Sequence, residues 1–173
     1  SKQEQISPLI NLGTIARLQG NVDQAETMYT VALAISREIG DGSGVLGALF
    51  GLGNVKADQG ELAEAESLYI EALEKSREIG ERYTEAGVLG NLGNIARRLR
   101  NFDDATRLYR ESLAIEREIG YSSGQANSLV SLAYLAYESE DYPLAESNYR
   151  EHVRICIKMG APLDDWFIEN GYT

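Results

Sequence analysis

Several residue types that common functions depend on are scarce in this sequence. Its 173 residues include one cysteine, Cys156, and one histidine, His152. A single cysteine cannot form an internal disulfide, which argues against a disulfide-stabilised secreted module and favours a cytoplasmic protein. With one histidine, no Ser-His-Asp arrangement and no reactive-cysteine signature, the sequence predicts a protein that is not an enzyme.

Metal ligands and nucleotide-binding motifs are equally sparse. His152 and Cys156 are four residues apart and could share one helix face, but a zinc site usually needs three protein ligands and the chain has no second histidine or cysteine. The stretch "GSGVLG" at 42–47 has the spacing G-x-G-x-x-G, yet it follows a helical segment rather than a strand, which favours a glycine-rich turn. We therefore expect no metal and no cofactor.

Positive charge and long apolar runs are also lacking. The chain has 16 Lys and Arg residues against 27 Asp and Glu residues, a formal net charge of −11, which argues against attraction of the whole surface to nucleic acid or anionic lipid. No apolar run approaches the ~20 residues that a membrane helix needs. The sequence therefore predicts neither a nucleic-acid nor a membrane partner. It begins at Ser1 rather than Met, which is typical of a processed or excised segment.

What the sequence does contain is a repeat of 40 residues. "SREIG" at 36–40 returns at 76–80, and "EREIG" stands at 116–120. Residues that recur with this spacing include Leu9, Leu49, Leu89 and Leu129, and also Tyr29, Tyr69, Tyr109 and Tyr149. The predicted organisation is four repeats, about 1–40, 41–80, 81–120 and 121–160, followed by a segment at 161–173.

Each repeat contains two predicted amphipathic helices. In the first repeat, apolar residues from Ala25 to Leu33 have the spacing of one helix face, and another helix precedes them from about residue 6 to 19. Gly20 in the turn suits a left-handed helix end, and Asn21 suits a capped helix start. Two such helices cannot bury their apolar faces alone, so neighbouring repeats must stack into a solenoid.

The repeat resembles the tetratricopeptide repeat. The family's spacing of Leu-Gly, Ala, a large aromatic and Ala is met by Leu12, Gly13, Ala25, Tyr29 and Ala32. The 40-residue length resembles the long-repeat variety of kinesin light chains and of spindle-orientation scaffolds that bind Gα-regulatory peptides. The resemblance implies a scaffold that binds peptides in a concave groove and not a catalyst.

We therefore expect an all-α fold, a right-handed α-solenoid of four helix-turn-helix repeats. Residues 161–173 leave the repeat pattern but contain Trp166 and Phe167 after Pro162. We expect this segment to form a short capping helix, because the last repeat of a solenoid would otherwise expose its apolar face.

One face of the first helix in each repeat, opposite the buried leucines, carries polar and aromatic residues. By the resemblance, this face lines the peptide-binding groove. Asparagine suits that role because its amide both donates to and accepts from an extended backbone. The predicted groove residues are Asn11, Arg17, Phe50, Asn54, Asn91, Asn94, Arg97, Arg98, Asn127, Tyr134 and Tyr137.

Structural alternatives exist for the same residues. The asparagines could instead form a hydrogen-bond ladder between helices. Glycines on this face weaken a helix by up to ~1 kcal/mol each relative to Ala, so they require a reason, either close approach of a ligand backbone or tight packing of neighbouring helices. The glycines concerned are Gly47, Gly51, Gly87 and Gly90.

The charge distribution indicates the kind of partner. The predicted first helices carry a small net positive charge, most basic at Arg97 and Arg98, whereas the rest of the chain is strongly acidic. We therefore expect a protein or peptide partner with acidic character, bound in an extended or short helical form. Two alternatives stay open: a peptide-sensing regulatory domain of a larger signalling protein, and a structural solenoid that assembles into homo-oligomers.

Overall fold

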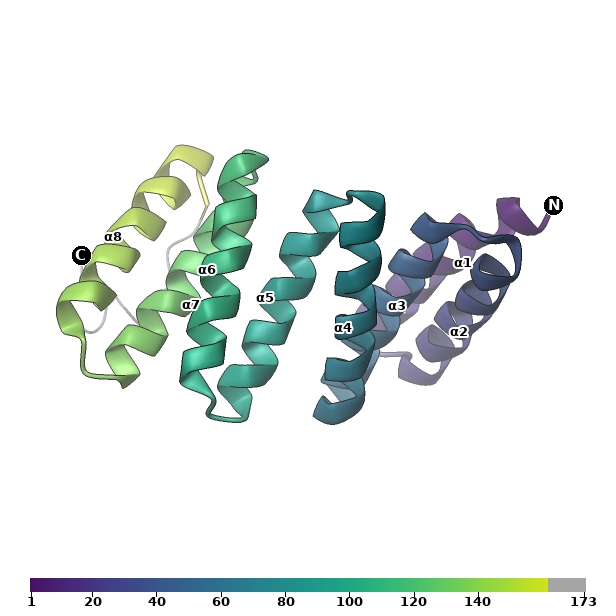
Figure 1. Cartoon of the computed structure of the whole chain (residues 1–173), viewed down its shortest axis with the longest axis horizontal. Coiled ribbons are helices and arrows are strands. Elements are labelled where there is room, and N and C mark those ends of the chain that lie inside the picture. The colour runs from purple at the N-terminus through teal and green to yellow at the C-terminus, as the bar shows by residue number, and fades with distance from the viewer. Residues whose placement is uncertain (162–173) are drawn as a thin grey trace. The chain divides into compact units, whose positions relative to one another are not determined.

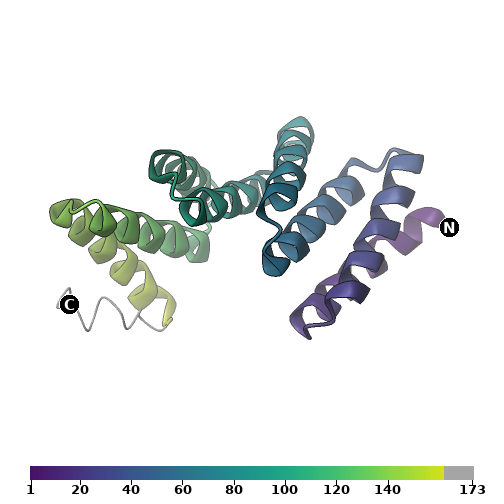
Figure 2. The ribbon, with the colours of Figure 1, turned by 90° about the horizontal axis from the view of Figure 1, so that it is seen from below.

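The structure, a computed structural model, describes residues 1–161. Within this range it contains eight helices and no strand, and the two helices of each successive pair lie side by side (Figures 1 and 2). The helices are α1 (Lys2–Leu18), α2 (Val22–Ile39), α3 (Gly42–Gln59), α4 (Leu62–Ile79), α5 (Arg82–Arg98), α6 (Phe102–Glu118), α7 (Ser122–Glu138) and α8 (Tyr142–Met159). The predicted all-α, helix-turn-helix architecture is confirmed. From residue 162 on, the predicted capping helix lies outside the described residues.

Contacts divide the chain into two compact units, Ser1–Glu81 and Arg82–Thr173. In the first unit, α3 packs against α2 and α4 and also touches α1. In the second unit, α7 packs against α6 and α8 and also touches α5. The first helices of the two repeats in each unit are therefore neighbours, which brings their predicted groove faces together within the unit.

A buried tyrosine in the second helix organises the core of each repeat. Tyr69 and Tyr109 are 1% and 2% exposed, and their equivalents are buried as well. A Cβ atom built on Gly53 would lie 2.5 Å from the Tyr69 ring, and one on Gly93 would lie 2.8 Å from the Tyr109 ring. Glycine at this position of the first helix therefore lets the ring lie directly against the helix backbone.

The turn inside each repeat requires a left-handed residue. Gly20 and Gly60 supply it with φ of 78° and 83°, which confirms the predicted glycine helix ends. Arg100 and Glu140 occupy the same position in the later repeats with φ of 62° and 61°. A side chain in this conformation is strained, so these two turns hold less favourable residues than the first two.

The predicted capping at the start of α2 is wrong. The N-cap residue Asn21 makes no side-chain cap hydrogen bond. The equivalent residues Asn101 and Asp141 do cap, because their side chains accept from the backbone N–H groups of Asp104 and Leu144 at 3.4 Å and 3.2 Å.

An apolar stripe on α1 is uncovered among the described residues. Leu12, Ile15 and Leu18 are 51%, 50% and 74% exposed. The residues equivalent to the first two, Leu132 and Leu135, are buried in one cluster with residues of α6. The α1 stripe is therefore the surface that, in a later repeat, packs against the preceding second helix.

We predict that Glu140→Gly stabilises the protein and Gly60→Ala destabilises it, each by roughly 1 kcal/mol. Glycine relieves the left-handed strain at position 140, and alanine introduces it at position 60. Urea or thermal unfolding measures both changes. Glu140→Ala keeps a Cβ atom and is the matched control. If it stabilises as much as Glu140→Gly, the cause is the lost charge and not the backbone.

Candidate functional site

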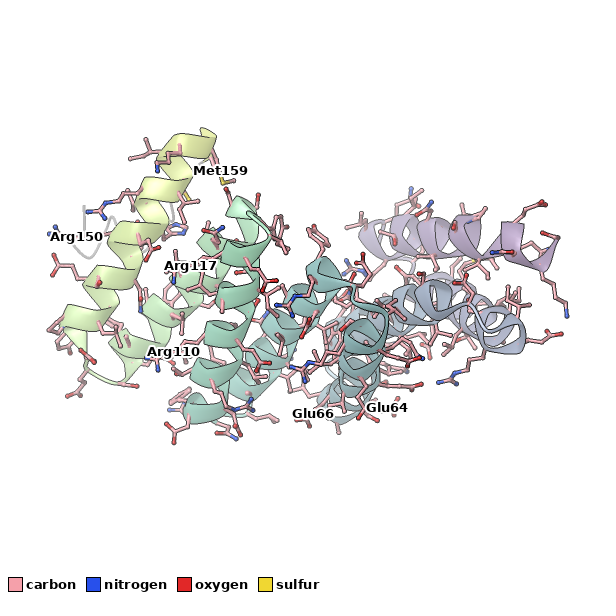
Figure 3. All side chains as sticks on the ribbon, turned by 45° about the horizontal axis from the view of Figure 1, so that its top comes forward. Glu64, Glu66, Arg110, Arg117, Arg150 and Met159 are labelled. Carbon is pink, nitrogen blue, oxygen red and sulfur yellow. The ribbon has the colours of Figure 1, made fainter. Side chains whose placement is uncertain are left out.

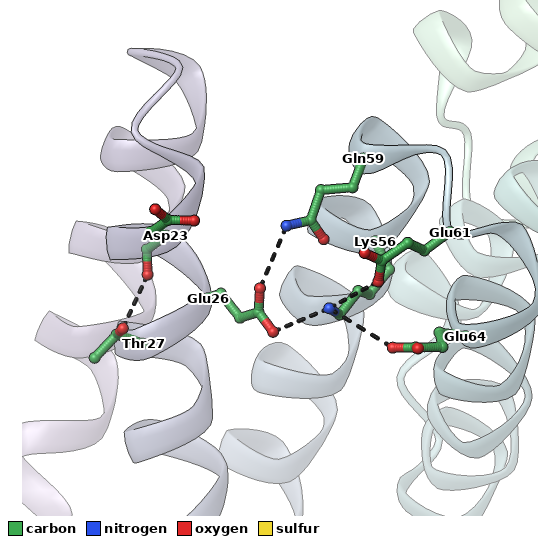
Figure 4. Close-up of polar contacts among 7 residues, drawn as sticks. All are labelled: Asp23, Glu26, Thr27, Lys56, Gln59, Glu61 and Glu64. Atoms are coloured by element: carbon green, nitrogen blue, oxygen red, sulfur yellow. Dashed lines mark hydrogen bonds and ion pairs between the residues drawn. The ribbon is translucent and has the colours of Figure 1, made fainter.

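The positive charges of the first unit are neutralised within that unit. The Nη1 atom of Arg17 on α1 lies 2.8 Å from Oδ2 of Asp58 on α3. Lys56 on α3 lies among three carboxylates, which Figure 4 shows. Its Nζ atom is 3.0 Å from Glu26, 2.9 Å from Glu61 and 3.6 Å from Glu64. These partners, Glu61 foremost, raise the pKa of Lys56. Neither cation is therefore free to attract an acidic partner.

The second helices of each unit are linked by a repeated ion pair. Arg37 Nη2 on α2 lies 2.5 Å from Glu71 Oε1 on α4. Arg117 Nη2 on α6 lies 2.6 Å from Glu151 Oε1 on α8, and Figure 3 labels Arg117 on its helix. These residues are about half exposed, so each pair contributes little to stability. These second-helix ion pairs thus lie on a solvated surface.

Asn54 and Phe50 in the first unit both contact a core tyrosine. The Tyr69 hydroxyl donates to Oδ1 of Asn54 at 2.7 Å, and the Phe50 ring is tilted against the Tyr69 ring with centroids 6.1 Å apart. Asn11 on α1 is exposed. Two of the predicted groove residues on α3 therefore also hold the core in place.

The second unit brings three predicted groove residues together around one cavity. Asn91 and Asn94 on α5 and Asn127 on α7 line a cavity of about 190 Å³. The remaining residues that line it are Ala86, Gly87, Gly90, Tyr109, Glu116, Tyr121, Gly124, Ser128 and Ser131. Its lining is rich in amides, hydroxyls and glycines and contains no lysine or arginine.

Hydrogen bonds between helices account for some of the asparagines on this face. The Tyr109 hydroxyl donates to Oδ1 of Asn94 at 2.7 Å, as Tyr69 does to Asn54 one repeat earlier. In the first repeat, the equivalent Thr14 hydroxyl lies 2.9 Å from the Tyr29 hydroxyl. The position thus supplies a partner for the buried tyrosine, and the exposed Asn94 also lines the cavity.

Tight helix packing explains some of the glycines on this face but not Gly90. A Cβ atom on Gly51 would lie 2.3 Å from the Tyr29 ring, and one on Gly47 would lie 3.0 Å from Ile10. Tight packing therefore accounts for these two. A Cβ atom on Gly90 would meet nothing closer than the Ser112 hydroxyl at 3.8 Å. Packing does not require glycine at position 90, which leaves room for a ligand above it.

The other predicted residues of the second unit lie outside the cavity lining. Arg97 and Arg98 are exposed at the end of α5. Burial raises the pKa of Tyr109, and the Arg97 guanidinium lies close enough to its hydroxyl to oppose that shift. Tyr134 and Tyr137 on α7 are half-buried; the Tyr137 ring packs edge-on against Tyr142 with centroids 5.5 Å apart.

Glu116 is the principal residue of this site that sequence reasoning missed. It is 5% exposed, and its Oε1 lies 3.1 Å from the Ser112 hydroxyl. Its Oε2 is buried and has no hydrogen-bond partner in the described part of the chain. Burial raises the pKa of Glu116, although the Ser128 and Ser112 hydroxyls oppose the shift. The repeat could have revealed Glu116, because the equivalent positions hold the smaller residues Ser36, Ser76 and Cys156.

His152 has a packing role. It is 6% exposed, and its Nδ1 lies 2.9 Å from the carbonyl oxygen of Ala126. Its other ring nitrogen lies 3.5 Å from the Cys156 sulfur. Among residues 1–161, no three His, Cys, Asp or Glu side chains are placed to hold a metal ion. None of the helices described there has both the length and the apolar character of a membrane span.

The sequence matches one family of repeat domains. A family model described as the MalT-like TPR region aligns with residues 2–165. The chain belongs to this family. Comparison of this MalT-like TPR chain with curated proteins gives no match.

Solved structures share the fold. BtubC (BKLC) from P. vanneervenii is 22% identical with a TM-score of 0.83, over 95% of this chain and 68% of its own. A Rap protein complexed with Competence and Sporulation Factor is 17% identical with a TM-score of 0.85, over 97% and 46%. The STAND protein PH0952 from Pyrococcus horikoshii, which has a tetratricopeptide repeat sensor, is 19% identical with a TM-score of 0.80, over 91% and 24%. This MalT-like TPR chain thus spans less than half of the last two, and the predicted α-solenoid class is confirmed.

We predict that Asn94→Ala lowers the free energy of unfolding by about 1 kcal/mol, because the Tyr109 hydroxyl loses its acceptor. Asn127→Ala, which removes an exposed amide from the same cavity, is the control and should have little effect. Urea unfolding of both variants, of Tyr109→Phe and of the Asn94→Ala, Tyr109→Phe double variant measures the coupling. Equal costs at positions 94 and 127, or full additivity in the double variant, would contradict the assigned hydrogen bond.

The raised pKa of Glu116 predicts a pH-dependent stability difference. A carboxyl whose pKa is higher in the folded state stabilises that state below its unfolded pKa, and the contribution is lost as the pH rises through the folded pKa. Glutamine cannot ionise, so the melting temperature of Glu116→Gln minus that of the wild type should increase between about pH 4 and pH 8. Glu138→Gln, an exposed change on α7, should show no such trend. A constant difference for Glu116→Gln would count against a buried, ionising carboxyl.

Proposed function

We propose that the chain is a protein-interaction scaffold that binds a peptide along the polar face of α5 and α7, the first helices of its second unit, with the cavity between them as the principal contact. The observation that carries the proposal is the polar lining of this cavity beside Gly90, where packing does not require a glycine. A ligand backbone can therefore approach α5 closely at this point.

The groups around the cavity suit an extended chain. The side chains of Asn91 and Asn127 carry both donors and acceptors, and Ser128 and Ser131 add hydroxyls that do either. Backbone amides of a peptide need donors and acceptors in alternation, whatever its side chains are. The lining therefore supports recognition of the peptide main chain, with specificity supplied by neighbouring groups.

The proposal that the partner is acidic rests on two arginines. Arg97 and Arg98 are both exposed at the end of α5. Carboxylates of a peptide that leaves the cavity toward the end of α5 would meet these two guanidinium groups. The rest of the acidic surface would repel such a peptide and so favour this one location.

The related structures agree with a binding role. The Rap structure is a complex with Competence and Sporulation Factor, so a chain of this fold holds a partner there. The repeats of PH0952 are described as a sensor, which is consistent with the alternative of a sensing domain in a longer protein. Both roles require a bound ligand, and both are tested by finding it.

Selection of displayed random peptides on the purified chain, followed by calorimetry, tests the proposal. We predict that Asn127→Ala weakens a selected peptide about fivefold to tenfold, since it removes hydrogen bonds of roughly 0.5–1.5 kcal/mol. Asn148→Ala, which removes an amide from the second helix α8, is the matched control. Replacing Arg97 and Arg98 together by Ala should flatten the salt dependence of binding, and replacing Arg110 and Arg154, which lie on the second helices, should not.

Three results would refute this function. The selection could yield no peptide, the Asn127→Ala and Asn148→Ala variants could bind equally, or the two arginine double variants could respond alike to salt. Sedimentation of the free chain accompanies these measurements, because self-association through the exposed Leu12, Ile15 and Leu18 stripe is the prediction of the structural alternative.

A further inference from the structure

Glu116 places an under-satisfied carboxylate in the lining of the cavity between α5 and α7. The side chain comes from the last turn of α6, is 5% exposed and is one of the residues that line the cavity. Its Oε2 atom is buried with no hydrogen-bond partner in the part of the chain that the structure describes. A buried carboxylate oxygen without a donor is costly, so the site favours an incoming donor.

The Ser128 hydroxyl lies near the Glu116 carboxyl, and the Ser112 hydroxyl that contacts Oε1 is shared with a second acceptor. The Ser112 hydroxyl lies 3.1 Å from Oε1 of Glu116 and 2.8 Å from the carbonyl oxygen of Ala86. A hydroxyl has a single hydrogen, so it cannot donate fully to both oxygens. Since the contact with Ala86 is the shorter, the carboxylate receives at most part of one hydrogen bond from its own helix.

Gly124 leaves room for the Glu116 side chain. A Cβ atom on Gly124, in the first turn of α7, would lie 2.6 Å from Oε1 of Glu116 and 2.4 Å from the Tyr121 ring. Tyr121 is the N-cap residue of α7 and makes no side-chain cap hydrogen bond. The positive end of this helix therefore lies beside the carboxylate and offsets part of the cost of burying it, without giving Oε2 a donor.

Among residues 1–161, no lysine or arginine lines the cavity to balance Glu116. On α5, the guanidinium of Arg97 lies by the Tyr109 hydroxyl rather than by Glu116. At about 190 Å³, the cavity has room for a charged group on a short alkyl stem.

We infer that the cavity binds a cationic side chain, lysine or arginine, of the bound peptide, with the Glu116 carboxylate as its counter-ion. This inference rests on the proposed peptide-binding function and adds a second specificity to it. A ligand would place its cationic residue between α5 and α7 and its carboxylates toward Arg97 and Arg98. Charge-assisted hydrogen bonds to a buried carboxylate are stronger than neutral ones, so this contact would fix the register of the peptide.

The first experiment uses small probes on the wild-type chain. n-Butylguanidinium and n-butylammonium carry the inferred groups, and n-butylurea is a neutral analogue of the first with nearly the same shape. Titrations followed by the backbone amide resonances of Gly90, Gly124 and Asn127 should give saturable shifts with the two cations and at least about tenfold weaker binding with the urea. No shifts at these amides, or equal binding of n-butylurea, would overturn the inference without any variant.

Variants then assign the binding to the carboxylate. Glu116→Gln should reduce n-butylguanidinium binding at least about tenfold, and Glu116→Ser, which places the residue found at positions 36 and 76, should do the same. Glu138→Gln removes an exposed carboxylate from α7 and is the control for the change in net charge. Retained binding in both Glu116 variants, or equal loss in Glu138→Gln, would show that the cation is not held by Glu116.

A capped pentapeptide, Gly-Gly-Arg-Gly-Gly, and the same peptide with citrulline in place of arginine test the source of the cation. The arginine peptide should bind at least severalfold more tightly than n-butylguanidinium, because its backbone adds contacts with the cavity asparagines. Equal affinities would mean a free small cation and would refute a peptide side chain. If selected peptides bind without preferring lysine or arginine, this inference fails while the proposed function stands. If no peptide binds, both fail.

Discussion

Each repeat depends on a tyrosine ring that lies against the backbone of the first helix. The contact removes a large aromatic surface from water, and it is possible only where the facing residue is small, as Gly53 and Gly93 are. Because the hydroxyl end of the buried ring needs a partner, the first helix must also offer an acceptor one turn away, which Asn54 and Asn94 provide. One packing constraint thus explains both a glycine and an asparagine in each of these repeats.

The same constraint shapes the candidate binding surface. In the second unit the acceptor for the tyrosine, Asn94, serves the fold through Oδ1 and is also one of the residues that line the cavity. At Asn94 the two roles coincide, whereas Asn127 is exposed and lines the cavity with no tyrosine hydroxyl as partner in the described part of the chain. Stability and binding are therefore separable by comparing these two positions, although both are asparagines on the same face.

The sequence predicts the repeats, the helix pairs and the family because these follow from periodicity, which one chain displays four times. It predicts the site less well, because a helix-face pattern does not tell which side chains have neighbours. Gly51 and Gly90 look alike in the sequence, yet a ring lies close to the first and open space lies beside the second. Arg17 and Arg97 share a repeat position, yet Arg17 pairs with Asp58 on the neighbouring first helix, whereas Arg97 lies by the Tyr109 hydroxyl.

Residues that depart from the repeat pattern are more informative than the repeated residues when one departure compensates for another. In the first unit, Gly44 leaves room for the buried Ser36 hydroxyl, since a Cβ atom there would lie 2.3 Å from it. In the second unit, Gly124 leaves room for the much larger Glu116 at the equivalent place. The other repeats have small residues at the position of Glu116. A glutamate there would normally be disfavoured by steric clashes and by the cost of removing its carboxylate from water. It is accommodated here by a glycine, a hydroxyl and a helix N-terminus, and the cavity that it lines is the one place in the unit where these polar groups converge.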